Sequence, residues 1–157
     1  MNTNKTIQTA SNTPSQHAGG ITIKSQQELD HMRAAGQITG AALRAVRKAI
    51  APGITTKELD RIAEKEIKSL GAKPAFKGYM GFPATICASV NEEIVHGIPS
   101  KRVLQEGDLF KVDCGATVNG FIGDSALSLE VGTVDPEVLN LSKITQQALY
   151  AGIEKAQ

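Results

Sequence analysis

The sequence has few cysteines, almost no net charge and no long apolar run. Its 157 residues carry 17 Lys and Arg against 16 Asp and Glu, so no excess of one sign points to nucleic acid or an anionic membrane as the partner. It contains no apolar stretch long enough to span a bilayer, and its first residues lead us to expect no secretory leader. We therefore expect a cytoplasmic protein that acts on small soluble ligands.

The two cysteines, Cys87 and Cys114, do not form a CxxC motif. In a cytoplasmic protein, two widely spaced cysteines are expected to be free thiols, buried as small apolar residues. A redox pair or a share in a metal site stays open as the alternative.

Length and composition predict one folded domain after a polar tail. A chain of 157 residues can bury roughly two-thirds of its unfolded surface, which is enough for a single core. Residues 1–20 have hardly any bulky apolar side chain, so they bury too little surface to offset the entropy of ordering. We predict a disordered tail over 1–20 and a folded domain over 21–157.

Two capping boxes, at 25–28 and 55–58, predict an antiparallel pair of helices. Apolar residues follow each box at helical spacing, and the Pro-Gly pair at 52–53 predicts the turn between the helices. Gly36 and Gly40 lie inside the first helix, where glycine is unfavourable, so they predict a close approach by another element.

The segments after these helices read as strands. Residues 84–90 predict a strand, 91–99 a segment at a strand edge, and 109–115 with 123–132 a β-hairpin around Asn119-Gly120. The predicted fold class is therefore α+β, with helices packed on an antiparallel sheet.

Asp135-Pro136 predicts the start of a last helix. Its apolar face is formed by Val138, Leu141, Ile144, Ala148 and Ala151. No glycine, asparagine or proline marks the end of this helix before Gln157.

Asp113 and Asp124 flank a glycine-rich turn within apolar, strand-forming sequence. An ionised carboxylate in a sheet costs several kcal/mol unless it is paired, so two on facing arms of a hairpin suggest a shared cation. A hard divalent metal is one candidate. Lys111, which alternates with Asp113 on the same strand face, is another, and solvated turn residues are the third.

His96 lies where a predicted strand ends and the turn Gly97-Ile98-Pro99 begins, a usual place for a functional side chain. A single histidine is nevertheless more often structural than catalytic, and its partners cannot be read from the sequence.

The stretches NEEIVHGIP and EGDLFKVDCGATVNGFIGDSA resemble the type I methionine aminopeptidases of the M24 metallopeptidases. The pattern of that family is N-E-x-x-x-H-G-x-P, then G-D-x-x-x-x-D-x-G-x-x-x-x-G-x-x-x-D. The resemblance extends back through GYMGFP to about Ile23. The chain has each fixed position: Asn91, Glu92, His96, Gly97, Pro99, Gly107, Asp108, Asp113, Gly115, Gly120 and Asp124.

The resemblance implies a pita-bread fold, with two related halves around two divalent metal ions (Co, Mn, Fe or Zn). It also implies an enzyme that removes the initiator methionine from polypeptides whose second residue is small. By motif position Asp113 and Asp124 would be metal ligands, with Asp124 bridging both ions, and His96 would be catalytic, contacting the scissile peptide. Phe76, Tyr79 and Phe82 match positions that line the methionine pocket, although aromatic residues in a loop are as often its packing core. The implied partners are the N-termini of nascent polypeptides near the ribosome, and the implied enzyme is a monomer.

The family also uses a histidine and two glutamates from the second half of the fold. The chain has no histidine after Asp124, and its later acids match no such motif. We therefore expect the N-terminal portion of a longer enzyme, inactive alone because two carboxylates hold a metal weakly and the general base is missing. The alternatives are a half-domain that pairs with another chain or a copy of itself, a non-catalytic binding module, and a proline-specific dipeptidase of the same fold.

Overall fold

The computed structural model describes residues 17–18 and 21–156. Two short strands come first, β1 (His17–Ala18) and β2 (Ile21–Thr22), which pair in antiparallel fashion. The tail predicted over 1–20 lies outside the described residues except for β1. No helix in the described part of the chain has both the length and the apolar composition needed to cross a membrane.

The two predicted capped helices are present as α1 (Gln26–Ala49) and α2 (Thr56–Ser69). Both begin with the full capping box: the N-cap hydroxyl accepts a hydrogen bond from the N–H of the glutamate three residues on, and that glutamate accepts one from the N-cap N–H. The two helices pack against each other, and Gly53, with φ of 97°, forms part of the turn between them.

The sheet has β5 (Leu109–Val118) at its centre. On one side β5 pairs along its whole length with β6 (Phe121–Glu130), and on the other it pairs with β4 (Ile86–Val90) and the short β3 (Lys73–Pro74). All pairs are antiparallel, as predicted. The hairpin turn is at Asn119-Gly120, whose φ values of 49° and 86° fit a type I′ turn.

The segment 91–99, predicted to lie at a strand edge, forms a loop and contains no strand of its own. It follows the edge of β4 only at Gly97, whose carbonyl accepts a hydrogen bond of 2.8 Å from the Ala88 N–H. Side chains 91–96 are exposed, so no apolar alternation supports a continued strand there.

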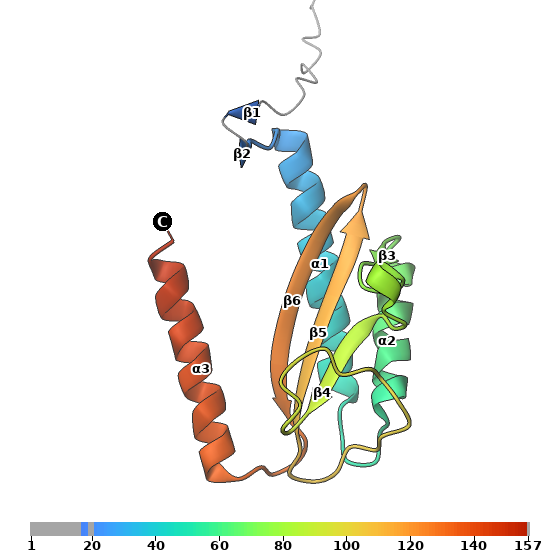
Figure 1. Cartoon of the computed structure of the whole chain (residues 1–157), viewed down its shortest axis with the longest axis vertical. Coiled ribbons are helices and arrows are strands. Elements are labelled where there is room, and N and C mark those ends of the chain that lie inside the picture. Colours follow the sequence, from blue (N-terminus) through green and yellow to red (C-terminus); the bar gives the residue numbers. More distant parts are fainter. Residues whose placement is uncertain (1–16, 19–20, 157) are drawn as a thin grey trace, which may run out of the picture.

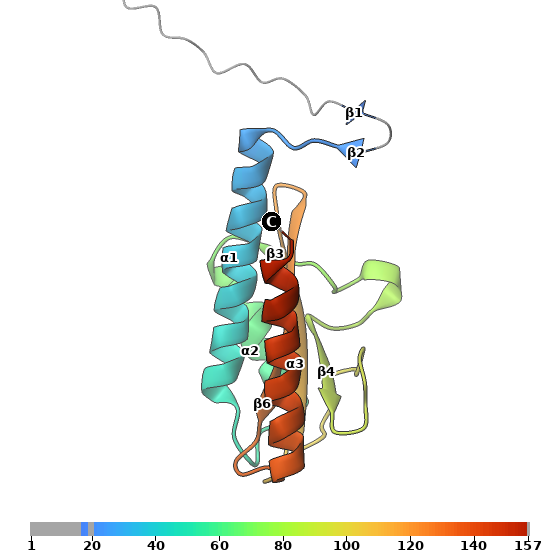
Figure 2. The same cartoon turned by 90° about the vertical axis from the view of Figure 1, so that its left-hand side faces the viewer.

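The helices α1 and α2 cover one face of the sheet, as Figures 1 and 2 show. Alternate residues of β5, among them Phe110, Val112 and Cys114, point into the core that the helices close. The opposite face carries Asp113, and on that side η1 (Tyr79–Gly81), a 3-10 turn, and the β4–β5 loop project (Figure 2). The α+β fold class predicted from the sequence is confirmed.

The close approach to α1 occurs at Gly36, but the glycine that allows it belongs to the strand. A Cβ at Gly123 of β6 would lie 2.5 Å from the Gly36 nitrogen, whereas a Cβ at Gly36 would meet nothing within 4 Å. Gly40 has only the flexible end of Arg44 nearby. The prediction of a close contact is therefore right for Gly36 and wrong for Gly40.

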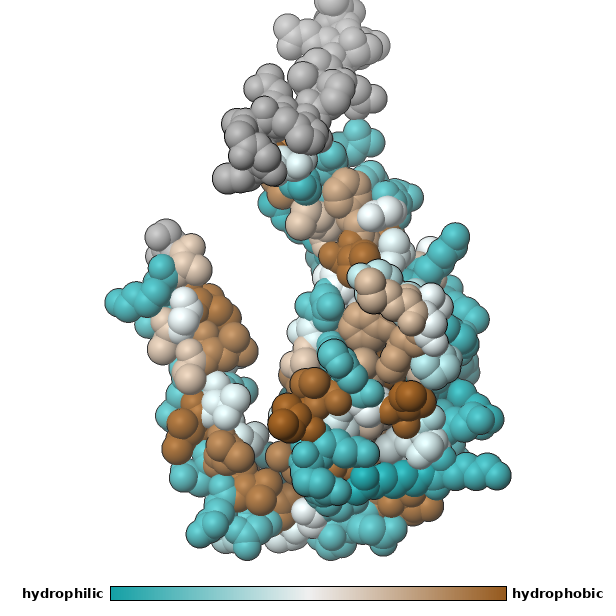
Figure 3. Space-filling view, in the orientation of Figure 1, coloured by the Kyte–Doolittle hydropathy of each residue, from teal (hydrophilic) through white to brown (hydrophobic). Residues whose placement is uncertain are grey.

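The last helix, α3 (Pro136–Glu154), begins at the predicted N-cap, Asp135, and has no buried residue. It stands beside β6 and apart from the other helices (Figure 1), and its apolar side chains are at the surface (Figure 3). Leu141 is 62% exposed and Leu149 61% exposed. The apolar face predicted for this helix is therefore uncovered in the described part of the chain.

Candidate active site

A pocket of about 610 Å³ lies on the sheet face opposite the helices. It is formed where η1, the first half of the β4–β5 loop and the strands β4, β5 and β6 meet. All six site residues predicted from the sequence are in its wall, although they come from segments up to 48 positions apart. The lining residues are Phe76, Tyr79, Met80, Gly81, Phe82, Pro83, Cys87, His96, Ile98, Asp113 and Asp124.

Asp113 on β5 and Asp124 on β6 are diagonal neighbours across the hairpin. Asp113 is paired with Ala126, and Asp124 is paired with Gly115, so both side chains point to the same face. Diagonal Cβ atoms in such a pair are within about 7–8 Å of each other. Two carboxylates at this spacing can share one proton or one cation.

The environment of Asp113 favours its protonated form. Burial, the charge of Asp124 and a hydrogen bond between the two side chains raise the pKa of Asp113 from 3.8 to about 6. The Cys114 N–H and the nearby His96 act in the opposite direction but do not cancel these effects. The two acids therefore lie close together without enough positive charge around them.

Lys111 does not supply that charge through an ion pair. Its Nζ donates to the carbonyl oxygen of Asn91, and none of the ion pairs of the described residues joins it to Asp113. The salt bridge that the sequence left open for Lys111 is therefore absent from this part of the chain.

Because Gly115 has no side chain, the ring of Phe76 has room to lie against β5 beside the carboxylates. Gly115 is opposite Asp124 in the ladder, and a Cβ there would lie 2.8 Å from Cε1 of Phe76. Tyr79 and Phe82 continue this wall around η1, where Gly78 and Gly81 have φ of 90° and 81°. The wall is thus apolar at one end and acidic at the other.

His96 reaches the pocket from the β4–β5 loop. Its φ of 60° lies in the left-handed region, which a non-glycine residue adopts only where the surrounding contacts demand it. Its side chain is exposed, and it lies close enough to Asp113 to affect the pKa of that carboxyl.

Cys87 is a pocket residue that we did not predict from the sequence. Both cysteines are free thiols and buried, as expected. Cys87 lies opposite Asp113 in the ladder between β4 and β5, and it also lines the pocket. Burial and the charges of Asp113 and Asp124 raise the pKa of this thiol to about 11. The signal was indirect: once the strands 84–90 and 109–115 are paired, alternation places one residue of β4 beside Asp113.

Two polar residues of the helices position the strands that carry the site. The hydroxyl of Thr39 on α1 donates to the Gly123 carbonyl at 2.9 Å and accepts from the Ala116 N–H at 3.1 Å, so it joins both arms of the hairpin. Asp60 on α2 accepts from the N–H groups of Thr85 and Ile86, which fixes the start of β4. Neither role was visible in the sequence, because both depend on contacts between distant segments.

The acidic groups of the pocket are the two carboxylates of Asp113 and Asp124. Within 17–18 and 21–156, no cluster of three or more His, Cys, Asp or Glu side chains is placed to hold a metal ion. Carboxylate oxygens suit hard and intermediate divalent cations, so the chemistry of Asp113 and Asp124 fits such an ion. Two ligands alone leave most coordination positions to water or to groups from elsewhere.

Comparison with known proteins gives a consistent result. The family model of metallopeptidase family M24 matches residues 30–157. The methionine aminopeptidase of Clostridium acetobutylicum is 52% identical over 137 residues, which cover 87% of this chain and 55% of that protein. The chain thus spans about half the length of the curated relatives it matches.

Solved structures agree with the sequence comparison. A methionine aminopeptidase from Thermotoga maritima superposes with a TM-score of 0.80 at 42% identity, covering 82% of this chain and 52% of that one. A prolidase from Pyrococcus furiosus superposes with a TM-score of 0.71 at 26% identity, covering 80% and 36%.

Proposed function

The chain belongs to metallopeptidase family M24, and on this basis we propose that it is the N-terminal part of a methionine aminopeptidase. That enzyme would remove the initiator methionine from polypeptides whose second residue is small. The α+β architecture is that of one half of the pita-bread fold, to which the matched structures belong. The greater similarity to the methionine enzyme than to the prolidase favours methionine over proline specificity.

One observation carries the proposal: a carboxylate pair and an apolar, aromatic wall share a single pocket. Asp113 and Asp124 would hold divalent metal, Asp124 as the ligand shared by two ions. The raised pKa of Asp113 supports this, because a cation between the carboxylates would replace the proton that they otherwise share. Co, Mn, Fe and Zn are the candidate metals.

The other residues would bind and orient the substrate. Phe76, Tyr79 and Phe82 offer an apolar surface suited to a flexible thioether side chain. His96, at the pocket wall, could hydrogen-bond to the scissile peptide group. A bound metal would act as a Lewis acid on the carbonyl and lower the pKa of the attacking water.

The described residues do not complete this chemistry. Only two carboxylates face the metal position, and the pocket has no other acid to act as general base. We therefore expect this chain alone to bind divalent metal weakly and to give no turnover. The partners of the whole enzyme would be nascent N-termini close to the ribosome, in the cytoplasm, and it would act as a monomer.

The proposal is tested by metal binding and hydrolysis. Calorimetric titration with Mn²⁺ should give weak binding that Asp113→Asn abolishes and that Asp30→Asn, on α1 and not in the wall of the pocket, leaves unchanged. Incubation of the chain with Mn²⁺ or Co²⁺ and Met-Ala-Ser should give no products. Equal Mn²⁺ binding by wild type and Asp113→Asn would overturn the metal assignment and favour a non-catalytic binding module.

Gel filtration tests a further alternative. A discrete dimer with tighter Mn²⁺ binding than the monomer would indicate that two copies of the chain complete one site. A metal affinity independent of protein concentration would contradict it.

A further inference from the structure

The loop that carries His96 has an unfavourable backbone. Asn91 at its start has φ of 55° and His96 has φ of 60°, and both are non-glycine residues in the left-handed region. The side chains of 91–96 are exposed, so apolar packing does not hold them. Such a conformation persists only where contacts over-determine it, so hydrogen bonds must set the position of His96.

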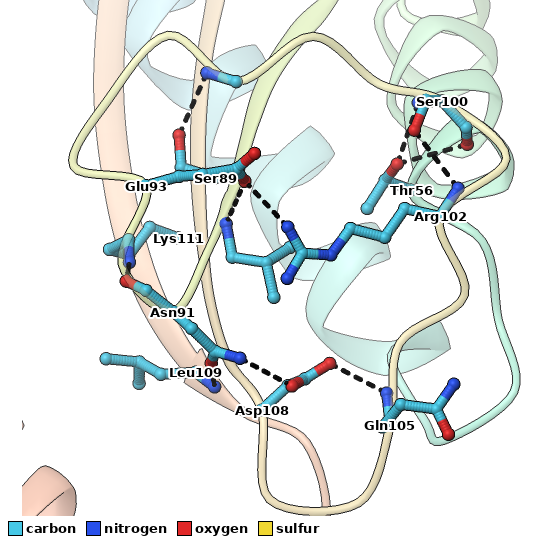
Figure 4. A network of polar contacts seen from close by, with 12 residues as sticks. Thr56, Ser89, Asn91, Glu93, Ser100, Arg102, Gln105, Asp108, Leu109 and Lys111 are labelled. Atoms are coloured by element: carbon cyan, nitrogen blue, oxygen red, sulfur yellow. Dashed lines mark hydrogen bonds and ion pairs between the residues drawn. The ribbon is translucent and has the colours of Figure 1, made fainter.

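At the N-terminal end of the loop, Asn91 hydrogen-bonds to β5 and to the residue before that strand (Figure 4). Its N–H donates to the Leu109 carbonyl at 2.9 Å, and its Oδ1 accepts from the Leu109 N–H at 2.9 Å. Its Nδ2 donates to Asp108 at 2.8 Å. The Asn91 carbonyl accepts from Nζ of Lys111, the contact through which a charged group of β5 reaches the loop backbone.

At the other end of the His96 loop, Gly97 hydrogen-bonds to β4. The Gly97 N–H donates to Oγ of Ser89 at 3.0 Å, and the Gly97 carbonyl accepts from the Ala88 N–H. Between the ends, Glu93 accepts from the Val90 N–H at 2.7 Å and pairs with Arg102 at 3.3 Å (Figure 4). With both ends tied to strands, the loop has little freedom to move His96.

Lys111 is the residue of β5 whose side chain hydrogen-bonds to the backbone of this loop. It lies two residues before Asp113 on β5, so the two side chains share one face of the sheet. Lys111, His96 and Asp113 line the same hollow of about 250 Å³ beside the main pocket. Its ammonium group therefore connects β5, the strand of Asp113, directly to the loop of His96.

We infer that Lys111 is a positioning residue: by donating from Nζ to the Asn91 carbonyl, it holds the His96 loop at a fixed place relative to Asp113. The inference rests on the proposed function for the catalytic value of that placement. The same contact directs Nζ of Lys111 to the loop, and no ion pair of the described residues joins it to Asp113.

Nuclear magnetic resonance of the whole chain without metal tests the inference. The variants are Lys111→Met, which removes Nζ, Lys111→Arg, which can still donate, and Lys101→Met, an exposed lysine of the same loop region, as the matched control. In Lys111→Met we expect the hydrogen-bonded amides of Glu93 and Gly97 to exchange at least tenfold faster, and the order parameter of the His96 amide to fall from about 0.85 to below about 0.6. Lys111→Arg should restore both, and Lys101→Met should change neither.

Unchanged exchange and order parameter in Lys111→Met would overturn the inference. So would an equal loss of protection at Val112 in the centre of β5, because Lys111 would then be a general stabiliser. If Lys111→Met does not fold, the exchange rates of the lysine ammonium protons are measured in the wild type instead. Ammonium protons of Lys111 that exchange with water as fast as those of Lys101 would overturn the inference. Because no metal is added, failure of the metal proposal leaves these readouts unaffected.

Discussion

The backbone of α1 at Gly36 lies directly against Gly123 of β6. A Cβ at Gly123 would come within 2.5 Å of the Gly36 nitrogen and 2.6 Å of its Cα, so no side chain fits between helix and strand. Asp124 is the next residue along β6. The contact that joins the two layers of the fold therefore also fixes one of the two carboxylates of the pocket.

The two glycines of this contact should respond differently to alanine. Gly123→Ala forces helix and strand apart and should lower the free energy of unfolding by about 2–3 kcal/mol. Gly36→Ala adds its methyl group to open space in a helix interior and should be neutral or stabilising by up to ~1 kcal/mol. Urea unfolding followed by circular dichroism measures both, and equal destabilisation would contradict the packing described for this contact.

The hydroxyl of Thr39 should contribute to stability through its bonds to both hairpin arms. Thr39→Val keeps the shape and leaves the Gly123 carbonyl and the Ala116 N–H without this partner, so we expect a loss of about 1–3 kcal/mol. Thr39 also donates to the Ala35 carbonyl, four residues earlier in its helix. Thr145 on α3 makes the same kind of bond to Leu141 but is exposed, which makes Thr145→Val the control, with a change within about 0.5 kcal/mol. Similar losses in thermal unfolding of the two variants would refute the bridging role.

Gly115 should be needed for ligand binding more than for folding. A methyl group there would lie 2.8 Å from Cε1 of Phe76 and 3.0 Å from Cβ of Ala75, which would move the aromatic ring toward the pocket. We expect Gly115→Ala to weaken the binding of methionine amide at least tenfold, or about 1.4 kcal/mol. Chemical-shift titration measures this, with Gly152→Ala, where a methyl group meets nothing within 4 Å, as the control. Unaltered affinity in Gly115→Ala would show that Phe76 is not part of the binding wall.

The stability of the metal-free chain should depend on the protonation of Asp113. Its pKa rises from 3.8 to about 6 on folding, so the folded state binds the proton more tightly than the unfolded state. The stabilisation from this group is fully present below about pH 4 and is lost as the pH rises through about 6. After discounting for solvent at this half-exposed group, we expect on the order of 1 kcal/mol.

The comparison of wild type with Asp113→Asn isolates this group from the other carboxylates. The difference in melting temperature between them should shift in favour of Asp113→Asn as the pH rises from about 4 to 7. Mn²⁺ at pH 7 should raise the melting temperature of wild type and not that of the variant. A difference that stays constant with pH would contradict the raised pKa.

The elements that form through local interactions could be predicted from the sequence. The capping boxes at 25–28 and 55–58 and the Asn119-Gly120 turn were predicted correctly, because each depends on residues within a few positions of one another. Asp113 and Asp124 were candidates because carboxylates within apolar strands need a partner, and His96 was one because it stands where a predicted strand ends and a turn begins. The shape of the 91–99 loop could not be predicted, because it depends on bonds to Leu109, Lys111 and β4 that lie outside the segment.

By itself the sequence determined the helices, the hairpin and the two carboxylates on its facing arms, since helical and strand periodicities and turn residues act over short range. Only the tertiary structure decided that β4 lies beside β5, which places Cys87 next to Asp113 and brings His96 and the aromatic wall to the same pocket. It also decided that Gly123 rather than Gly36 makes room between the layers, and that α3 is left exposed. These are properties of strand register and layer packing, which arise from contacts between segments tens of residues apart and have no local signature.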